Sequence, residues 1–343
     1  MKTRTKSVLR LLGLYLAAAP ALITGTTAAF TSNASNLANS FTADPDWIGP
    51  PIPSSIIQKD PQLLTGGFIR SNSGYRVYAN VGPDSGNPAT GISTVTANVA
   101  VAGNVITAGQ TAVALTTTGG PWTINGTSYA YRTASLTSGT LTNANRTYSI
   151  TASDLDTPAN VVSANFSVTG DITQPQDSAI STANGGGILG RMQAGDSIIY
   201  TFSEQIEPES ILVGWTGSST NIVVRVTDGT GGGGSNNDHV QIWNSTNSTQ
   251  LPLGRIRTGS NAYISGGAGT FGASGTPSTM VMTSPTVLTV TFGTAAGTYA
   301  TVGNATLNWR SSDAVSAVAI IDRAGNALGA GNLAETGGSD PNF

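Results

Sequence analysis

Short segments with an apolar residue at every second position recur along most of the chain. A period of two, frequent Val and Thr, and Gly, Asn, Asp or Pro in the gaps predict β-strands with one buried face. No long window after residue 29 keeps a helical period with capping residues, so we expect an all-β protein. The clearest segments carry their apolar residues at Tyr75, Val77, Ala79 and Val81; Val95, Ala97, Val99 and Val101; Tyr148, Ile150 and Ala152; and Val162, Ala164, Phe166 and Val168.

The first 29 residues follow a different pattern. Four basic residues lie within the first ten positions, an apolar run covers residues 11–23, and small residues follow at 26–29. This order is typical of a secretory signal peptide, and the apolar run is shorter than the roughly 20 residues that span a bilayer. We therefore predict cleavage after Ala28 or Ala29 and a secreted product, extracellular or associated with the cell surface. We expect no membrane partner after cleavage.

Two stretches rich in turn residues divide the rest of the chain. Residues 44–53, DPDWIGPPIP, contain four prolines and predict a stiff, extended linker. A second boundary is expected at residues 170–175. Beyond a signal peptide at 1–29, we predict a spacer and proline-rich linker at 30–53, a first β-sandwich at 54–170, and a second β-sandwich with glycine-rich loops at 171–343.

The composition narrows the choice of partners. Charged residues make up 10% of the chain, well below the usual share of about 25%. Removal of the predicted signal peptide takes four of the 15 basic residues and no acidic one, which leaves 11 basic against 18 acidic residues. This balance does not favour nucleic acid or anionic lipid, since both attract clustered Lys and Arg. The absence of cysteine excludes disulfides and thiolate metal sites, and it favours a bacterial source.

The segment after the predicted cleavage site resembles the signal segment of camelysin/TasA-type secreted proteins. Their pattern is A-x-F-x-S-x-A followed by N-x-F-x-A, and it is matched here by Phe30, Ala34, Asn39, Phe41 and Ala43. The resemblance implies a dedicated signal peptidase, and several such proteins build biofilm fibres. Asp44 stands where the family usually has Gly, and nothing beyond it resembles the TasA body. The alternative is an ordinary signal peptide followed by a spacer rich in Ser and Asn.

Both predicted sandwiches resemble bacterial immunoglobulin-like domains. In the first, residues 148–160 approach the pattern Y-x-x-x-A-x-D-x-x-G-N, although Pro-Ala-Asn replaces Gly-Asn at 158–160. In the second, FSEQIEPESI at 202–211 fits F-S-E-x-[IV]-[DE]-P-x-S-[IL], and DRAGN at 322–326 fits D-x-A-G-N. The second resemblance is to domains of surface-layer and large cell-surface proteins. It implies two immunoglobulin-like β-sandwiches in tandem.

Carboxylates are the first candidates for chemistry. Glu204, Glu207 and Glu209 form the densest group, and a carboxylate pair can hydrolyse glycosidic bonds. The resemblance explains this segment instead as a transition from strand to turn, and we favour that structural interpretation.

Calcium is the next candidate, because oxygen ligands suffice for it. Asp154, Asp156 and Asn160, or Asp322 and Asn326, would supply side-chain oxygens at the edge of a domain. Asp and Asn also cap turns by bonding to their own backbone, which is the interpretation that we favour at both places.

The remaining candidates are a histidine, a lysine and the tryptophans. His239 is the single histidine, and we expect it in an exposed loop beside the glycine-rich run at 231–238, where a catalytic base would not be held rigidly. Lys59 is the only lysine after the signal peptide, so at most one Lys–Asn isopeptide crosslink can form. Core or rim packing is expected for the tryptophans, although sugar stacking is arguable for the first: Trp122, Trp215, Trp243 and Trp309.

These observations predict a secreted, non-enzymatic bacterial structural or adhesive protein of the cell surface or extracellular matrix. The alternative is a carbohydrate-binding module protein. We assign no catalytic, cofactor-binding or metal-binding residue and no cofactor. The expected partners are further copies of the chain, other cell-surface proteins or polysaccharide, with no nucleic acid. In one hypothesis, residues 30–41 dock on a neighbouring subunit, because the edges of a sandwich can accept an added strand.

Overall fold

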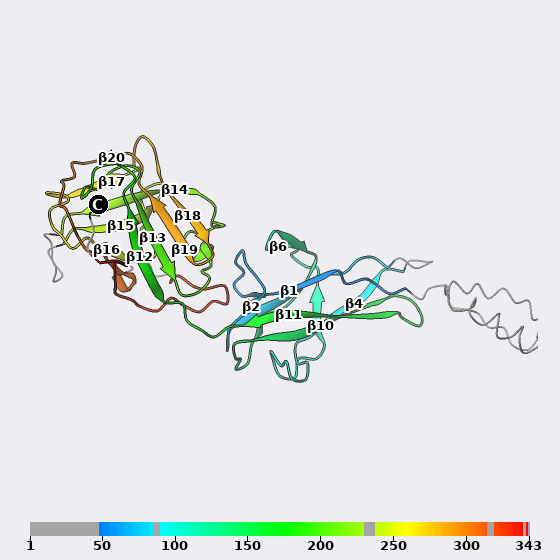
Figure 1. The fold of residues 1–343 in the computed structure, drawn as a ribbon. Coiled ribbons are helices and arrows are strands. Elements are labelled where there is room, and N and C mark those ends of the chain that lie inside the picture. The colour runs from blue at the N-terminus through cyan, green and yellow to red at the C-terminus, as the bar shows by residue number, and fades with distance from the viewer. Residues whose placement is uncertain (1–47, 85–89, 230–236, 314–318, 339–340, 342–343) are drawn as a thin grey trace, which may run out of the picture. The chain divides into compact units, whose positions relative to one another are not determined.

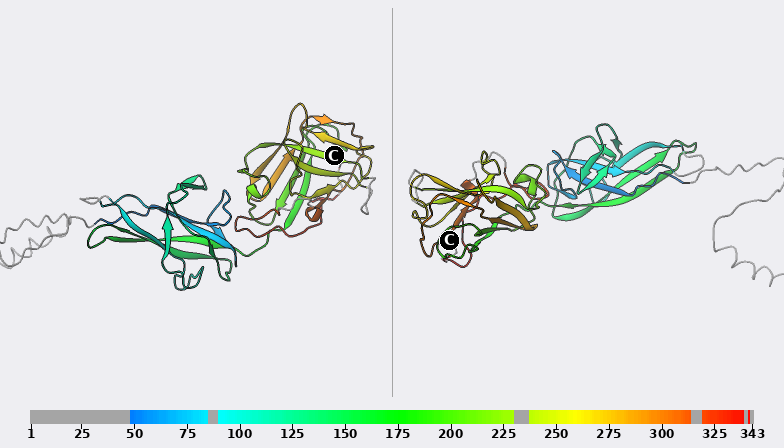
Figure 2. Two further views of the ribbon diagram at one scale, coloured as in Figure 1. Left: turned by 180° about the vertical axis from the view of Figure 1, so that it is seen from behind. Right: turned by 90° about the horizontal axis from the view of Figure 1, so that it is seen from above.

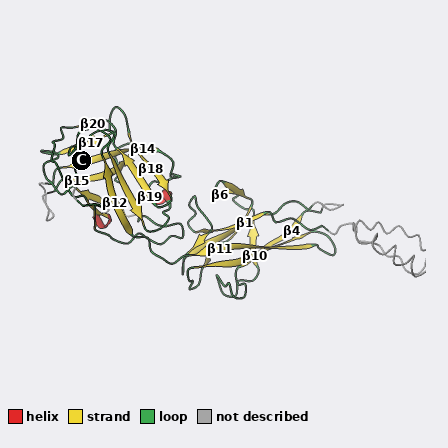
Figure 3. Cartoon of the chain, viewed as in Figure 1, coloured by secondary structure: helices red, strands yellow, loops and turns green. Residues whose placement is uncertain are grey.

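The computed structural model describes residues 48–84, 90–229, 237–313, 319–338 and 341. In this part of the chain the regular structure is β-strand apart from two short 3-10 helices, and the strands group into two bodies (Figures 1 and 3). The prediction of an all-β chain with two tandem sandwich-like bodies is confirmed. No helix among the described residues is both long and apolar enough to cross a bilayer. The predicted signal peptide and the proposed docking segment 30–41 lie outside the described residues.

The first body contains the strands from residue 54 to residue 170. They are β1 (Ser54–Lys59), β2 (Phe68–Ile69), β3 (Gly74–Asn80), β4 (Ile92–Asn98), β5 (Val113–Thr116), β6 (Trp122–Ile124), β7 (Thr127–Tyr129), β8 (Tyr131–Thr133), β9 (Leu136–Thr137), β10 (Ala144–Asp154) and β11 (Val161–Gly170).

The strands of the first body follow the order β1-β3-β8-β5-β4-β10-β11-β2. Strand β9 pairs with β3, and β6 and β7 form a separate hairpin. Strand β5 pairs with β4 on one side and with β8 on the other, so it connects the two layers of the sandwich. The long strands β10 and β11 pair along almost their whole length. They give this body its longest ladder (Figure 1).

The predicted alternation appears in the burial of these strands. In β10, Tyr148, Ile150 and Ala152 are fully buried, whereas the residues between them are partly exposed. Because side chains of a strand point alternately to its two faces, one face of β10 belongs to the core and the other faces outward. The same holds for β4, where Val95 and Ala97 are buried.

The second body contains the strands from residue 177 to residue 334, seen from two further directions in Figure 2. They are β12 (Asp177–Ala183), β13 (Ser197–Phe202), β14 (Thr220–Thr227), β15 (His239–Asn244), β16 (Arg255–Arg257), β17 (Ala268–Phe271), β18 (Ser278–Ser284), β19 (Val287–Thr291), β20 (Ala295–Ala296), β21 (Asn308–Arg310) and β22 (Leu333–Ala334).

The strands of the second body follow the order β12-β13-β19-β18-β14-β15-β16-β21-β22, and β17 and β20 branch from β14. The two ends of this order approach each other. The N–H of Thr336, just after β22, donates to the carbonyl of Ile180 in β12 at 2.8 Å. The hydroxyl of Thr182 donates to Oε1 of Glu335 at 2.6 Å. The body is therefore close to a barrel, and its terminal strands are not free edges at these residues.

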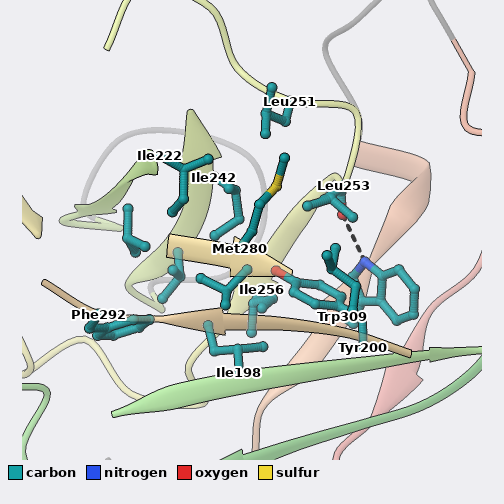
Figure 4. Close-up of a cluster of buried hydrophobic side chains, with 14 of the residues drawn as sticks. Ile198, Tyr200, Ile222, Ile242, Leu251, Leu253, Ile256, Met280, Phe292 and Trp309 are labelled. Carbon is teal, nitrogen blue, oxygen red and sulfur yellow. Dashed lines mark hydrogen bonds between the residues drawn. The ribbon is translucent and has the colours of Figure 1, made fainter. Parts of the chain in front are cut away.

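The core of the second body is built around a tryptophan (Figure 4). Trp309 is completely buried, with the rings of Tyr200 and Phe202 edge-on to it at centroid distances of 5.0 and 5.5 Å. Its Nε1 donates to the carbonyl of Leu253 at 2.7 Å. A buried indole N–H needs such a partner, so this hydrogen bond helps to fix the ring in the core.

Candidate functional site

The turn between β10 and β11 is organised by Asp154, the last residue of β10. Its side chain is 1% exposed. Oδ1 accepts hydrogen bonds from the backbone N–H of Asp156 at 3.1 Å and of Asn160 at 2.8 Å. These are the local bonds with which Asp stabilises turns, so the structural role predicted for Asp154 is confirmed. The second oxygen, Oδ2, is buried and has no hydrogen-bond partner among the described residues.

Two further carboxylates lie beside Asp154. Asp84, Asp154 and Asp156 each offer one oxygen, and these three oxygens lie within 4.8 Å of one another. Asp84 follows β3 and is 3% exposed, and its Oδ2 accepts from the N–H of Thr90 at 3.3 Å. The N–H of Leu155 donates to the carbonyl of Gly91 at 3.2 Å, which holds the turn against the start of β4. We call Asp84, Asp154 and Asp156 the first cluster.

A second group of carboxylates is formed by Asp171, Glu204 and Asp322, whose ligand oxygens also lie within 4.8 Å of one another. Asp322 is 1% exposed. Its Oδ1 accepts from the backbone N–H of Gly325 at 2.6 Å and of Asn326 at 2.8 Å, and its Oδ2 accepts from Nδ2 of Asn326 at 2.8 Å. We call these three carboxylates the second cluster.

The carboxylates of the second cluster disfavour one another's charge. Burial raises the pKa of Glu204, and the negative charges of Asp171 and Asp322 raise it further. Burial likewise raises the pKa of Asp322, while its hydrogen bonds from Asn326 and Gly325 act in the opposite direction. A carboxyl group with a raised pKa takes up a proton more readily, so this cluster can relieve its repulsion by protonation.

The three glutamates that are dense in sequence do not form one site. Glu204 belongs to the second cluster, and Oε1 of the third, Glu209, accepts from the N–H of Gly214 at 3.2 Å. Glu207 is completely buried and forms an ion pair with Lys59 at 3.0 Å. The segment leaves β13 at residue 202 and enters a 3-10 helix at Pro208–Ser210, which agrees with the predicted transition from strand to turn.

Lys59, the single lysine of the described residues, is buried and paired with a glutamate. Nζ of Lys59 donates to Glu207 and also to the carbonyl of Arg323 at 2.9 Å. The hydroxyl of Thr65 donates to the same oxygen of Glu207, while Oε1 of Glu207 has no partner within the described ranges. A buried charge is tolerated when it is paired and hydrogen-bonded. Among the described residues, the hydrogen-bond partners of Nζ are Glu207 and the carbonyl of Arg323 rather than an asparagine, so these contacts do not support an isopeptide crosslink.

The prediction for His239 is wrong. His239 does not lie in an exposed loop but is the first residue of β15. It pairs with Thr227 of β14 and with Arg257 of β16, and it is half-buried. Burial lowers the pKa of His239, and the positive charge of Arg255 lowers it further. The run of Gly and Asn that precedes it in the sequence suggested a loop, but the ladder begins at the histidine itself.

The tryptophans pack as expected for a core and its rim. Trp309 lies in the core described above, and Trp215 is buried with Nε1 donating to the carbonyl of Ser218. Trp243 is partly buried under the guanidinium of Arg225, 3.5 Å from the ring centroid. Trp122, the best candidate for sugar stacking, is 8% exposed, and the guanidinium of Arg132 lies over its ring at 4.2 Å. Stacking on a sugar needs an exposed ring face. Arg132 covers a face of the Trp122 ring, and little of the residue remains exposed.

The outward face of β4, β10 and β11 has a composition that sequence reasoning did not single out. Apart from the exposed Val161, which lies opposite Ser153, its side chains carry hydroxyl or amide groups and no charge, and all are exposed or partly exposed. We call it the polar face. Its residues are Thr94, Thr96 and Asn98 on β4; Thr147, Ser149, Thr151 and Ser153 on β10; and Ser163, Asn165 and Ser167 on β11.

The register of the three strands aligns the polar face in rows. Thr151 lies opposite Thr96 on one side and Ser163 on the other, and Ser149 lies between Asn98 and Asn165 in the same way. Hydroxyl groups of neighbouring strands bond to one another, since Thr151 and Ser163 approach to 2.7 Å. The alternation of β10 and β11 contained this signal, because the outward positions of residues 145–153 and 163–169 all hold small polar residues.

No model of a known protein family matches the chain, and no curated protein matches it. The functional assignment therefore depends on the residues and contacts described above.

Proposed function

We propose that the chain is a secreted, non-enzymatic bacterial structural or adhesive protein of the cell surface or extracellular matrix. The signal-peptide pattern of the first 29 residues supports export. The observation that carries the proposal is the polar face, an ordered array of hydroxyl and amide groups on three adjacent strands. It is the part of the first body that contacts a neighbouring copy, another surface protein or a matrix polymer.

The chemistry of the polar face suits adhesion. Each hydroxyl or amide both donates and accepts hydrogen bonds, so the face can bond to many partners that present the same groups. Because the face has no charged side chain, no ion must be stripped of water when a partner covers it. Two copies that meet through this face would also avoid the repulsion expected of an acidic chain.

A charge at the centre of the polar face tests the proposal. Thr151→Lys places an ammonium group between Thr96 and Ser163, and covering it would bury an unpaired charge. We expect assembly in solution, measured by light scattering and electron microscopy, or attachment to cells and matrix, to fall at least about tenfold. Thr123→Lys is the matched control, since Thr123 is exposed on β6, outside the polar face. Equal behaviour of the two variants would contradict the proposal.

The alternative function, a carbohydrate-binding module, makes a different prediction. If Trp122 stacked on a sugar, Trp122→Ala would abolish retention on polysaccharide and Thr151→Lys would not. The burial of Trp122 and the guanidinium of Arg132 over its ring support packing instead. A polysaccharide pull-down with both variants separates a binding site at the ring from one at the polar face.

A further inference from the structure

The first cluster combines two features that are costly in the absence of a ligand. Three carboxylates present oxygens within 4.8 Å of one another, and like charges at such distances repel. In addition, Oδ2 of Asp154, a residue that is 1% exposed, is buried and receives no hydrogen bond from the part of the chain that the structure describes. A buried polar atom that lacks a partner destabilises the folded state. One bound cation would resolve both features.

We propose that Asp84, Asp154 and Asp156 bind one calcium ion. Oxygen ligands lie about 2.3–2.6 Å from calcium, so two ligands of one ion are separated by at most about 5 Å. The oxygens of the first cluster satisfy this limit. All three ligands are hard carboxylate oxygens, which suit calcium or magnesium better than zinc or copper.

The set of ligands favours calcium over magnesium. Magnesium demands a near-ideal octahedron at about 2.0–2.1 Å and keeps several waters, whereas calcium accepts irregular sets of ligands. In the first cluster, Oδ1 of Asp154 is already committed to the N–H groups of Asp156 and Asn160. The remaining oxygen of Asp154 and those of its two neighbours would give the ion three carboxylate ligands from two separate connections of the sandwich. Calcium accepts such a set, whereas magnesium usually binds through only one or two carboxylates.

The ion would join parts of the chain that are far apart in sequence. Asp84 belongs to the connection between β3 and β4, whereas Asp154 and Asp156 belong to the turn between β10 and β11. The same strands β4, β10 and β11 carry the polar face, so the ion would stabilise one end of it. The adjoining Leu155 and Val161 are 61% and 62% exposed, and a fixed turn would hold these apolar side chains at that end. The calcium site does not depend on the proposed function.

Calorimetric titration tests the proposal directly. Calcium chloride is titrated into the protein expressed from the full chain and treated with a chelator. We expect one calcium ion per chain, with a dissociation constant on the order of 0.1–1 mM, the weak end of the range of protein calcium sites. We also expect saturating calcium to raise the Tm of the first body by roughly 5–10 °C. Magnesium chloride should bind at least about tenfold more weakly.

Variants assign the ion to its ligands. Asp156→Asn and Asp84→Asn each remove one charge and should weaken calcium binding at least about tenfold, since affinity follows the charge of the ligands. Glu204→Gln removes a charge from the second cluster and serves as the matched control, so its calcium affinity should equal that of the unaltered protein. Circular dichroism in chelator confirms that each variant is folded.

Each remaining outcome overturns the proposal. Calcium binding that Asp156→Asn and Asp84→Asn leave unchanged would place the ion elsewhere, and its loss in Glu204→Gln would place it in the second cluster. Absence of binding at 10 mM calcium chloride, roughly ten times the weakest expected dissociation constant, would show that the carboxylates carry no ion. Preference for magnesium would contradict the assignment to calcium.

Discussion

The two carboxylate clusters contain the same turn in two versions. In each, a buried Asp accepts backbone hydrogen bonds at Oδ1, including one from an Asn further along the turn. The versions differ at Oδ2. In the second cluster the side chain of Asn326 donates to Oδ2 of Asp322 at 2.8 Å. In the first cluster no described residue donates to Oδ2 of Asp154, and the side chain of Asn160 donates to Asp156 at 3.5 Å.

The length of the turn explains this difference. The short turn DRAGN places Asn326 four positions after its Asp, close enough for backbone and side chain to bond to the same carboxylate. The longer turn DLDTPAN places Asn160 six positions after Asp154 and adds a second acid, Asp156. The short turn satisfies its own carboxylate, whereas the long turn adds negative charge and leaves an oxygen free. Similar turns can therefore be a structural cap in one body and a cation site in the other.

The largest expected effect comes from removing the carboxylate that anchors a turn. Asp154→Ala leaves the N–H groups of Asp156 and Asn160 without their acceptor, and we expect a loss of about 2–4 kcal/mol in the free energy of unfolding. Asp322→Ala should cost a similar amount in the second body without calcium. Urea denaturation in chelator and in calcium measures both. With calcium added, the loss in the free energy of unfolding should grow for Asp154→Ala and stay constant for Asp322→Ala. The opposite pattern would place the calcium ion in the second cluster instead of the first.

A smaller effect is expected when the second cluster is made to resemble the first. Asn326→Ala removes the donor to Oδ2 of Asp322 and a bond at 3.1 Å to the carbonyl of Asp171. We expect a loss of about 1–2 kcal/mol. Because the variant frees an oxygen of Asp322 beside Glu204, calcium should now raise the Tm of the second body. Thermal unfolding with and without calcium measures this change in Tm. An equal Tm in both conditions would mean that a free carboxylate oxygen alone does not create a calcium site.

The smallest expected effect is a pH dependence of the stability of the second body. Burial raises the pKa of Asp177 in β12 to about 6, while a hydrogen bond from Ser311 opposes the shift. The folded state then keeps a proton that the unfolded state, with a pKa of about 3.9, has already released. The stability from this group is complete below about pH 4 and is lost as the pH rises through about 6. Asp177→Asn should flatten the pH dependence of the second body's Tm in this window. An unchanged slope would assign it to other groups, such as Glu204 and Asp322, whose pKa values are also raised.

Much of the fold could be predicted from sequence, because a strand with one buried face leaves a pattern of alternating apolar residues within a few neighbouring positions. Tyr148, Ile150 and Ala152 are buried as expected. The turn residues Asp154, Asp156 and Asn160 could be proposed together for the same reason, since they are close in sequence. The immunoglobulin-like type of the two bodies, the export route and the camelysin/TasA-type signal segment stay predictions.

The complete clusters could not be predicted, because tertiary pairing assembles them. Asp84 reaches the first cluster through the pairing of β4 with β10, and no local pattern connects it with Asp154. Glu204 was grouped with Glu207 on spacing alone, but the end of β13 and the 3-10 helix at 208–210 send these two carboxylates to different partners. Asp171 lies 33 positions before Glu204 and Asp322 lies 118 positions after it, so only tertiary contacts bring the three together.

Anomalous X-ray diffraction from crystals grown in calcium chloride would test the difference between the clusters most directly. We expect one anomalous peak, about 2.3–2.6 Å from an oxygen of each of Asp84, Asp154 and Asp156, and no peak beside Asp322. A peak confined to Asp171, Glu204 and Asp322, or a hydrogen-bonded water in place of an ion at Oδ2 of Asp154, would contradict it.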